Sequence, residues 1–202
     1  MNKRRLLLGL AGLAALLAVT LFAGWWQVDG PGAIAPRLPK AAGPPPLAQA
    51  AMTLTDHEGR RISPANWVGR PTLLFFGFTY CPDVCPTTLS DITGWLEVLG
   101  EDAQDMNVAF VTVDPERDTV ETMSEYLDMF HPSIVGYTGT PDDIKKTADF
   151  FGVFYDKVKT EGGYTMNHTA TVLLFDAAGN FQSTIDYHEA REIAVPKIKK
   201  VL

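Results

Sequence analysis

"PTLLFFGFTYCPDVCPTTL", residues 71–89, contains the strongest fold signal in the chain and both of its cysteines. Pro71–Phe78 is a continuous apolar run, which is typical of a central strand covered on both faces. In Thr87–Leu99 the apolar residues recur at helical spacing. The stretch therefore predicts a buried strand, a loop that carries Cys81, and a helix that begins at or near Cys85.

Outside this stretch, short apolar runs alternate with segments of helical spacing, which is typical of an α/β sheet with helices on both faces. The expected strands are Val108–Val113, Ile134–Tyr137 (a short strand or a loop), Thr171–Phe175 and Phe181–Ile185. The expected helices are Thr119–Phe130, Pro141–Phe151 and Ala190–Val201, the last interrupted or delayed by Pro196. Upstream of them, Met52–Thr55 and Arg61–Ser63 predict an N-terminal hairpin.

Cys81 and Cys85 are separated by three residues, and three uses of the pair have to be compared. A structural disulfide across so short a loop would stabilise the fold by only about 2 kcal/mol. A redox pair fits better, because a dithiol at a helix start in an α/β domain is the thioredoxin arrangement. The free N–H groups of a helix start lower the pKa of a nearby thiol, and the resulting thiolates are also ligands for soft metals.

Two departures from the thioredoxins favour a metal. Thioredoxins have two residues between their cysteines, and the third residue here widens the separation available to the reduced sulfurs. Thioredoxins also place a cis proline before the strand that faces the dithiol, whereas Asn167–Phe175 has no proline and contains a histidine. We expect this histidine, His168, to lie at the start of a buried strand beside Pro71–Phe78 and to act as a third ligand.

Two thiolates and one imidazole suit copper as Cu(I) or Cu(II), and the same three ligands also accept Zn(II). Met166 lies two residues before His168 and offers a thioether, although a packing role is favoured for it. The other three histidines, His57, His131 and His188, occupy positions typical of turns and helix ends. The sequence thus singles out one imidazole among four.

With these features in place, the chain resembles the Sco/SenC family, the copper chaperones of cytochrome c oxidase assembly. The resemblance covers roughly Met52–Leu202 and includes the order of membrane anchor, linker and domain. It is carried by "FFGFTYCPDVCP" (Phe75–Pro86), "VDPERDT" (Val113–Thr119), "GTPDDI" (Gly139–Ile144) and "NHTATVLLFD" (Asn167–Asp176).

The resemblance implies a thioredoxin-like fold and copper bound by Cys81, Cys85 and His168. It also implies delivery of that copper to the dinuclear copper site of a cytochrome c oxidase subunit, with another copper chaperone as a candidate donor. A thiol–disulfide role on the cysteines of that subunit is part of the same expectation, and in it the oxidised Cys81–Cys85 pair forms a disulfide.

The segment "VDPERDT" can also be interpreted from its residues alone. Asp114 and Asp118 flank Arg117 at the end of a strand, so both are expected to cap the following helix and to pair with the arginine. The segment is interpreted as structural support near the cysteines.

Other functions share the same residues. A membrane-tethered thiol–disulfide reductase with incidental metal affinity is the main alternative, and a copper or redox sensor would use the same site. A peroxidase is disfavoured, because peroxidatic cysteines usually need an arginine near the thiolate and the sequence places none close to Cys81 or Cys85. Whether the protein is an enzyme is therefore left open at this point.

The N-terminus predicts a membrane anchor, residues 1–27, with a single transmembrane helix at residues 6–26. This run has no charge and, at about 1.5 Å per residue, is long enough for a bilayer core of about 30 Å. The basic cluster before it favours a cytoplasmic N-terminus, and so a C-terminal domain in the periplasm of a bacterial inner membrane. A cleaved signal peptide is the alternative, but the run is longer than usual and no good cleavage site ends it.

Residues 28–50, rich in Pro, Ala and Gly, predict an extended linker, and residues 51–202 the folded domain. The first 50 residues hold five basic residues and one acidic residue, so the remainder carries 12 basic and 23 acidic residues. An acidic domain argues against nucleic acid as a partner, because binding phosphates requires Lys and Arg.

Overall fold

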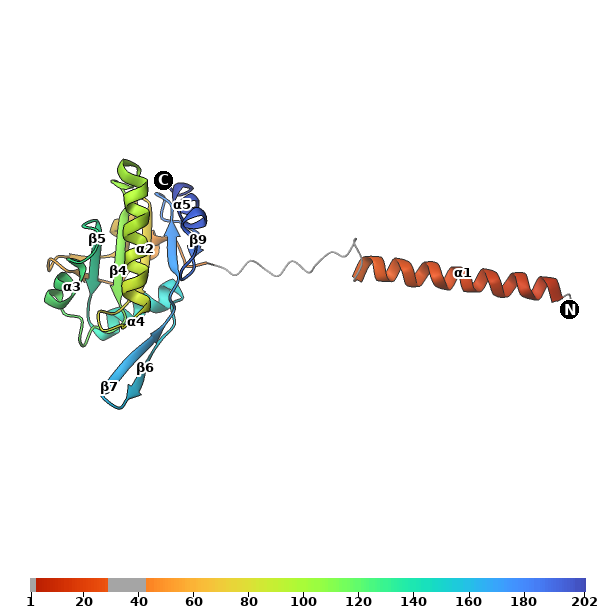
Figure 1. The fold of residues 1–202 in the computed structure, drawn as a ribbon, viewed down its shortest axis with the longest axis horizontal. Coiled ribbons are helices and arrows are strands. Elements are labelled where there is room, and N and C mark those ends of the chain that lie inside the picture. Colours follow the sequence, from red (N-terminus) through yellow and green to blue (C-terminus); the bar gives the residue numbers. More distant parts are fainter. Residues whose placement is uncertain (1–2, 29–42) are drawn as a thin grey trace. The chain divides into compact units, whose positions relative to one another are not determined.

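The computed structural model describes residues 3–28 and 43–202 (Figure 1). Contacts divide the chain into two units, residues 1–42 and 43–202. Most of the expected linker, residues 29–42, lies outside the described residues.

In the first unit, α1 (Lys3–Val28) is a single helix of 26 residues. Leu7–Trp26 within it has a mean hydropathy of 2.3, and by length and composition it could cross a membrane. This is the helix expected at residues 6–26.

The second unit is built on a seven-stranded sheet in the order β2-β1-β5-β4-β3-β8-β9. β3 pairs in parallel with β4, and β4 in parallel with β5, whereas β8 and β9 continue the sheet in antiparallel fashion. The strands of this sheet are β1 (Leu54–Asp56), β2 (Arg61–Ile62), β3 (Thr72–Gly77), β4 (Asn107–Thr112), β5 (Ile134–Thr138), β8 (Val172–Phe175) and β9 (Phe181–Ile185). Every strand expected from the sequence is present, and β8 lies beside β3 as predicted.

The helices are α2 (Val84–Leu99), α3 (Val120–Leu127), α4 (Pro141–Phe151) and α5 (Arg191–Lys199). Successive residues of a strand point to opposite faces of a sheet. Phe75 of β3 stacks on Phe110, which contacts Tyr126 of α3, whereas Phe76 packs against Phe151 of α4 with ring centroids 5.8 Å apart. Helices therefore cover both faces, as predicted, and α5 runs through Pro196 without interruption.

One element was not predicted. β6 (Tyr155–Thr160) and β7 (Gly163–His168) form an antiparallel hairpin that is a separate two-stranded sheet (Figure 1). Most of its side chains are polar and only Met166 is buried, so the sequence lacks the apolar alternation that marks a half-buried strand. As a result His168 is the last residue of this hairpin, and the strand that it was expected to begin starts four residues later at Val172.

The folded unit also begins earlier than the boundary at residue 51 that the sequence predicts. The side chain of Leu47, in the short 3-10 helix η1 (Leu47–Gln49), is fully buried in the core of the sheet domain. The backbone N–H of Leu47 donates a hydrogen bond of 2.9 Å to the carbonyl of Gly179. Because the segment is rich in proline, the sequence did not indicate that Leu47 packs in the core.

Substituting this leucine tests the earlier boundary. Leu47→Ala should lower the free energy of unfolding by about 2–5 kcal/mol, because it leaves a cavity in a closed site. Chemical denaturation measures the change. Val98→Ala is a matched control on an exposed face of α2, and it should change stability by no more than about 0.5 kcal/mol. Equal effects of the two substitutions would mean that Leu47 is not part of the core.

Candidate metal centre

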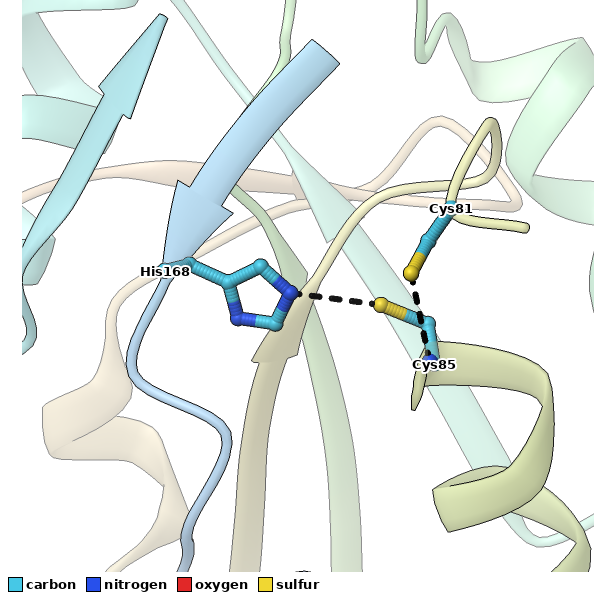
Figure 2. A group of neighbouring side chains, drawn as sticks. All are labelled: Cys81, Cys85 and His168. Atoms are coloured by element: carbon cyan, nitrogen blue, oxygen red, sulfur yellow. Dashed lines mark hydrogen bonds between the residues drawn. The ribbon is translucent and has the colours of Figure 1, made fainter. Parts of the chain in front are cut away.

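Three side chains from separate elements meet beyond the carboxyl end of β3. Cys81 lies in the loop after the strand and is partly exposed, Cys85 is the second residue of α2 and is buried, and His168 ends β7. Their ligand atoms all lie within 4.8 Å of one another, and Figure 2 shows the imidazole facing the two sulfurs. Cys85 Sγ is 3.4 Å from His168 Nε2, and both cysteines are free thiols.

The backbone around the cysteines explains this placement. A Cβ atom at Gly77 would lie 2.8 Å from Cys85 Sγ and 2.7 Å from a ring carbon of Phe110, so only glycine leaves room for the buried thiol. The N–H of Cys81 donates to the carbonyl of Phe78 at 3.2 Å, which turns the chain tightly after the strand. The N–H of Cys85, one of the free donors at the start of α2, points to Cys81 Sγ at 3.4 Å.

The imidazole of His168 is oriented by its surroundings. Nδ1 lies 2.9 Å from the carbonyl of Thr169, and because a carbonyl only accepts, Nδ1 carries the proton. Nε2 therefore presents its lone pair to the sulfurs, which is the tautomer that a metal ligand requires. The ring also packs edge-on against Phe78, with centroids 5.8 Å apart and planes at 89°.

The two thiols differ in acidity. The neighbouring Cys85 side chain is the main cause that lowers the pKa of Cys81 to about 4, and the backbone N–H groups of residues 83 and 85 add to it. The neighbouring Cys81 sulfur, together with burial, raises the pKa of Cys85. Because its folded-state pKa is depressed, Cys81 stabilises the fold fully above its unfolded pKa of about 8.5, and this contribution is lost as the pH falls through about 4.

This difference predicts the pH profile of alkylation. At pH 6 Cys81 should hold roughly 300-fold more thiolate than an ordinary thiol, although the lower nucleophilicity of an acidic thiolate offsets about 60- to 180-fold of that. Cys81 should therefore react with iodoacetamide about two- to fivefold faster than a free thiol, as measured by mass spectrometry. In Cys85→Ala the inflection should move upward from about pH 4. An unchanged profile in that variant would show that Cys85 does not set the acidity.

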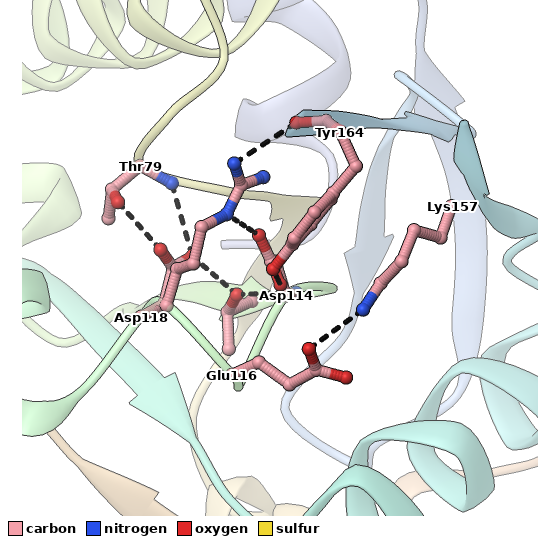
Figure 3. A network of polar contacts seen from close by, with 8 residues as sticks. Thr79, Asp114, Glu116, Asp118, Lys157 and Tyr164 are labelled. Carbon is pink, nitrogen blue, oxygen red and sulfur yellow. Dashed lines mark hydrogen bonds and ion pairs between the residues drawn. The ribbon is translucent and has the colours of Figure 1, made fainter. Parts of the chain in front are cut away.

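The segment Val113–Thr119 supports the cysteine loop, but not in the way expected. The N-cap of α3 is Thr119, whose side chain accepts from the N–H of Thr122, so neither aspartate caps the helix. Asp118 does not pair with Arg117 either. Its fully buried carboxylate accepts from Thr79 N at 3.1 Å, Thr79 Oγ1 at 2.6 Å and Thr112 Oγ1 at 2.5 Å (Figure 3).

Asp114 pairs with Arg117, as the sequence predicted. It is buried and forms an ion pair with Arg117, and it also accepts a hydrogen bond of 2.9 Å from the hydroxyl of Tyr164 on β7. The sequence analysis gave no individual role to Thr79, Phe78 or Tyr164. Their contacts depend on the unpredicted hairpin and on the turn after β3.

The other candidates occupy the ordinary roles expected of them. Met166 is buried in the core of the domain. His57 Nδ1 accepts from the N–H of Gly136 and His131 Nδ1 from that of Ser133, while His188 lies 3.5 Å from the carboxylate of Asp91. Among the described residues, Cys81, Cys85 and His168 form the one group of three or more such side chains placed to hold a metal ion.

Comparison with known proteins identifies relatives of the folded unit. A family model described as SCO1/SenC matches residues 41–202. The structure of Bradyrhizobium japonicum ScoI with copper bound is 41% identical and superimposes with a TM-score of 0.71, covering 80% of this chain and 100% of that one. Its thioredoxin-like α/β architecture confirms the fold class expected from the sequence.

Two curated relatives are the SCO2-like protein RP587 of Rickettsia prowazekii and the mitochondrial SCO1 homolog 1 of Arabidopsis thaliana. They are 38% and 37% identical over 131 residues, which is 63% and 64% of this chain. The matched segment spans 64% of the Rickettsia protein and 39% of the Arabidopsis protein.

Proposed function

The chain belongs to the SCO1/SenC family, and from this premise we propose that it is a membrane-tethered copper chaperone. In this proposal Cys81, Cys85 and His168 hold the copper, which is cargo rather than a resident cofactor. The observation that carries it is the meeting of two sulfurs and one imidazole nitrogen within 4.8 Å. The thiolates favour Cu(I), and the added imidazole also accepts Cu(II).

The family association with cytochrome c oxidase assembly supports the acceptor that we propose, the dinuclear copper site of an oxidase subunit. Cys81 is the more exposed thiol, so thiolates of the acceptor reach the copper first on that side. Exchange of one ligand at a time then moves the ion without releasing it into solution. Another copper chaperone is the proposed donor.

We place the domain, residues 43–202, in the periplasm of a bacterium, attached to the inner membrane by α1 through residues 29–42. The basic residues before the apolar run support a cytoplasmic N-terminus. The acidic balance of the domain suits a cationic cargo and argues against nucleic acid as a partner.

A second function is favoured by the unequal thiols. An acidic, partly exposed Cys81 beside a buried Cys85 suits a nucleophile and a resolving thiol. Cys81 would attack a partner disulfide and form a mixed disulfide. Cys85 would then attack that bond and release the partner thiol, and two electrons would pass to the partner as the Cys81–Cys85 disulfide forms. Because the disulfide form has no free thiolates for copper, this oxidation would also release the metal.

The test is anaerobic copper loading of the full chain in detergent. His168→Ala should lower copper affinity by at least about 100-fold and change the Cu(II) absorption spectrum, since losing a ligand costs more than the 10- to 100-fold typical of losing an outer partner. His131→Ala is the matched control, because that ring bonds only the backbone near it, and it should behave like wild type. Normal copper content and spectrum in His168→Ala, together with reduction of partner disulfides, would favour the reductase.

A further inference from the structure

The hairpin that carries His168 is held by side chains. Within the described residues, β6 and β7 form their own two-stranded sheet with no ladder to the seven-stranded sheet. An isolated hairpin is only marginally stable in water. Contacts made by its side chains must therefore decide where the end of β7, and with it the imidazole, is placed.

Arg117 makes contacts on both sides of the site. Its guanidinium carbon lies 3.8 Å from the ring centroid of Tyr164 on β7, and Nη1 donates to the Tyr164 carbonyl at 3.1 Å. The same guanidinium lies 4.7 Å from the ring centroid of Tyr80 and 5.9 Å from that of Phe78. Tyr80 directly precedes Cys81, so one planar cation touches the hairpin and the cysteine loop.

Asp114 fixes this guanidinium in place. Its carboxylate pairs with Arg117 and accepts from the hydroxyl of Tyr164, so the ring and the cation share one buried anion (Figure 3). Arg117 Nη2 is buried without a hydrogen-bond partner among the described residues. A buried donor left unpaired costs about 1–3 kcal/mol, so the stacking and the ion pair must outweigh that cost to hold the side chain here.

Phe78 connects this cluster to the metal ligands. Its ring is in reach of the guanidinium and packs edge-on against the imidazole of His168. On the basis of the proposed copper function, we propose that Arg117 is a positioning residue. It holds the β6–β7 hairpin against the cysteine loop and so sets the distance from His168 to the two sulfurs.

The first test is a double-mutant cycle on the full chain in detergent. Arg117→Met should lower copper affinity about 10- to 100-fold, as is typical for a partner that orients a ligand, and should shift the Cu(II) spectrum toward that of His168→Ala. In the His168→Ala background, Arg117→Met should have no further effect on affinity, because the residue acts through the imidazole. Arg117→Lys keeps the charge but loses the planar fork and the stacking, so its effect should be intermediate.

The second test needs no copper. In the metal-free protein, Arg117→Met should raise amide hydrogen exchange in Tyr155–His168 while leaving β3 and β4 protected. Lys157→Met is the matched control. Lys157 lies 4.2 Å from the same Tyr164 ring but pairs with the exposed Glu116, so its loss should leave exchange and copper affinity unchanged.

The outcomes separate the two proposals. Failure of wild type to bind copper overturns the proposed function, and hairpin exchange still decides the role of Arg117. Normal exchange in Arg117→Met, or a wild-type copper spectrum in that variant, overturns the inference. An equal loss of copper affinity from Arg117→Met in the wild-type and His168→Ala backgrounds would also overturn the inference. That result would mean that the substitution disturbs the whole fold and does not act through the imidazole.

Discussion

Replacing either cysteine by serine should abolish tight copper binding. A serine hydroxyl stays protonated at neutral pH and is a hard, weak ligand, so each variant leaves copper with one thiolate and one imidazole. Wild type should retain about one copper per chain after anaerobic desalting against a thiol competitor such as glutathione, whereas Cys81→Ser and Cys85→Ser should each retain close to none. Metal analysis of the desalted protein measures the result.

The two cysteine variants should nevertheless differ in their remaining thiol. Cys81→Ser leaves the buried Cys85, which should alkylate slowly because burial disfavours its thiolate. Cys85→Ser keeps a donor beside Cys81, and because a hydroxyl is a stronger hydrogen-bond donor than a thiol, the pKa of Cys81 should stay low. Stability of both variants serves as the control, since serine is nearly isosteric with cysteine. Retention of copper by either one would remove that sulfur from the ligand set.

Asp118→Ala should cost about 3–5 kcal/mol of unfolding free energy. The substitution leaves Thr79 N, Thr79 Oγ1 and Thr112 Oγ1 without their acceptor in a fully buried site, and each orphaned donor costs about 1–3 kcal/mol unless it can rotate to another partner. Thr79 lies two residues before Cys81, so copper affinity should also fall. Denaturant unfolding and copper titration measure the two effects.

The control for this prediction is an aspartate on the surface. Asp149→Ala removes an exposed ion pair with Lys145 and should change stability by less than about 1 kcal/mol. Burial raises the pKa of Asp118. The part of its stabilisation that depends on protonation is therefore fully present below its unfolded pKa of about 3.9 and is lost as the pH rises through its folded value, whereas the hydrogen bonds from Thr79 and Thr112 persist to the ionised carboxylate. A loss below about 1 kcal/mol in Asp118→Ala would show that the threonines find other partners.

Much of the core could be predicted because its signals are local. The apolar run that forms β3 and the helical spacing of α2 lie within a few residues of each other, and they place Cys81 and Cys85 at a strand-to-helix turn. The pairing of β8 with β3 was expected from the thioredoxin arrangement, in which this strand faces the dithiol. The sequence did not predict the β6–β7 hairpin because most of its residues are polar and carry no periodic apolar pattern.

The sequence predicted which three side chains are candidate ligands, but not which elements hold them. The absence of proline in its segment singled out His168, yet the residue lies at the end of β7 and not at the start of β8. The expected caps at Asp114 and Asp118 were wrong, because both carboxylates are turned into the protein. Asp114 meets Arg117 and Tyr164, and Asp118 meets two threonines from neighbouring strand ends.

The amino-acid order alone determined the apolar helix, the strands and helices of the core, and the residue types that suit a soft metal, since all of these are written in short-range spacing and chemistry. The meeting of an imidazole with a sulfur 83 positions away depended on the folded domain, as did the Arg117 contacts and the burial of Leu47. The physical reason is that spacing specifies which face a side chain occupies within its own element. The approach of two elements is set by packing across the whole core.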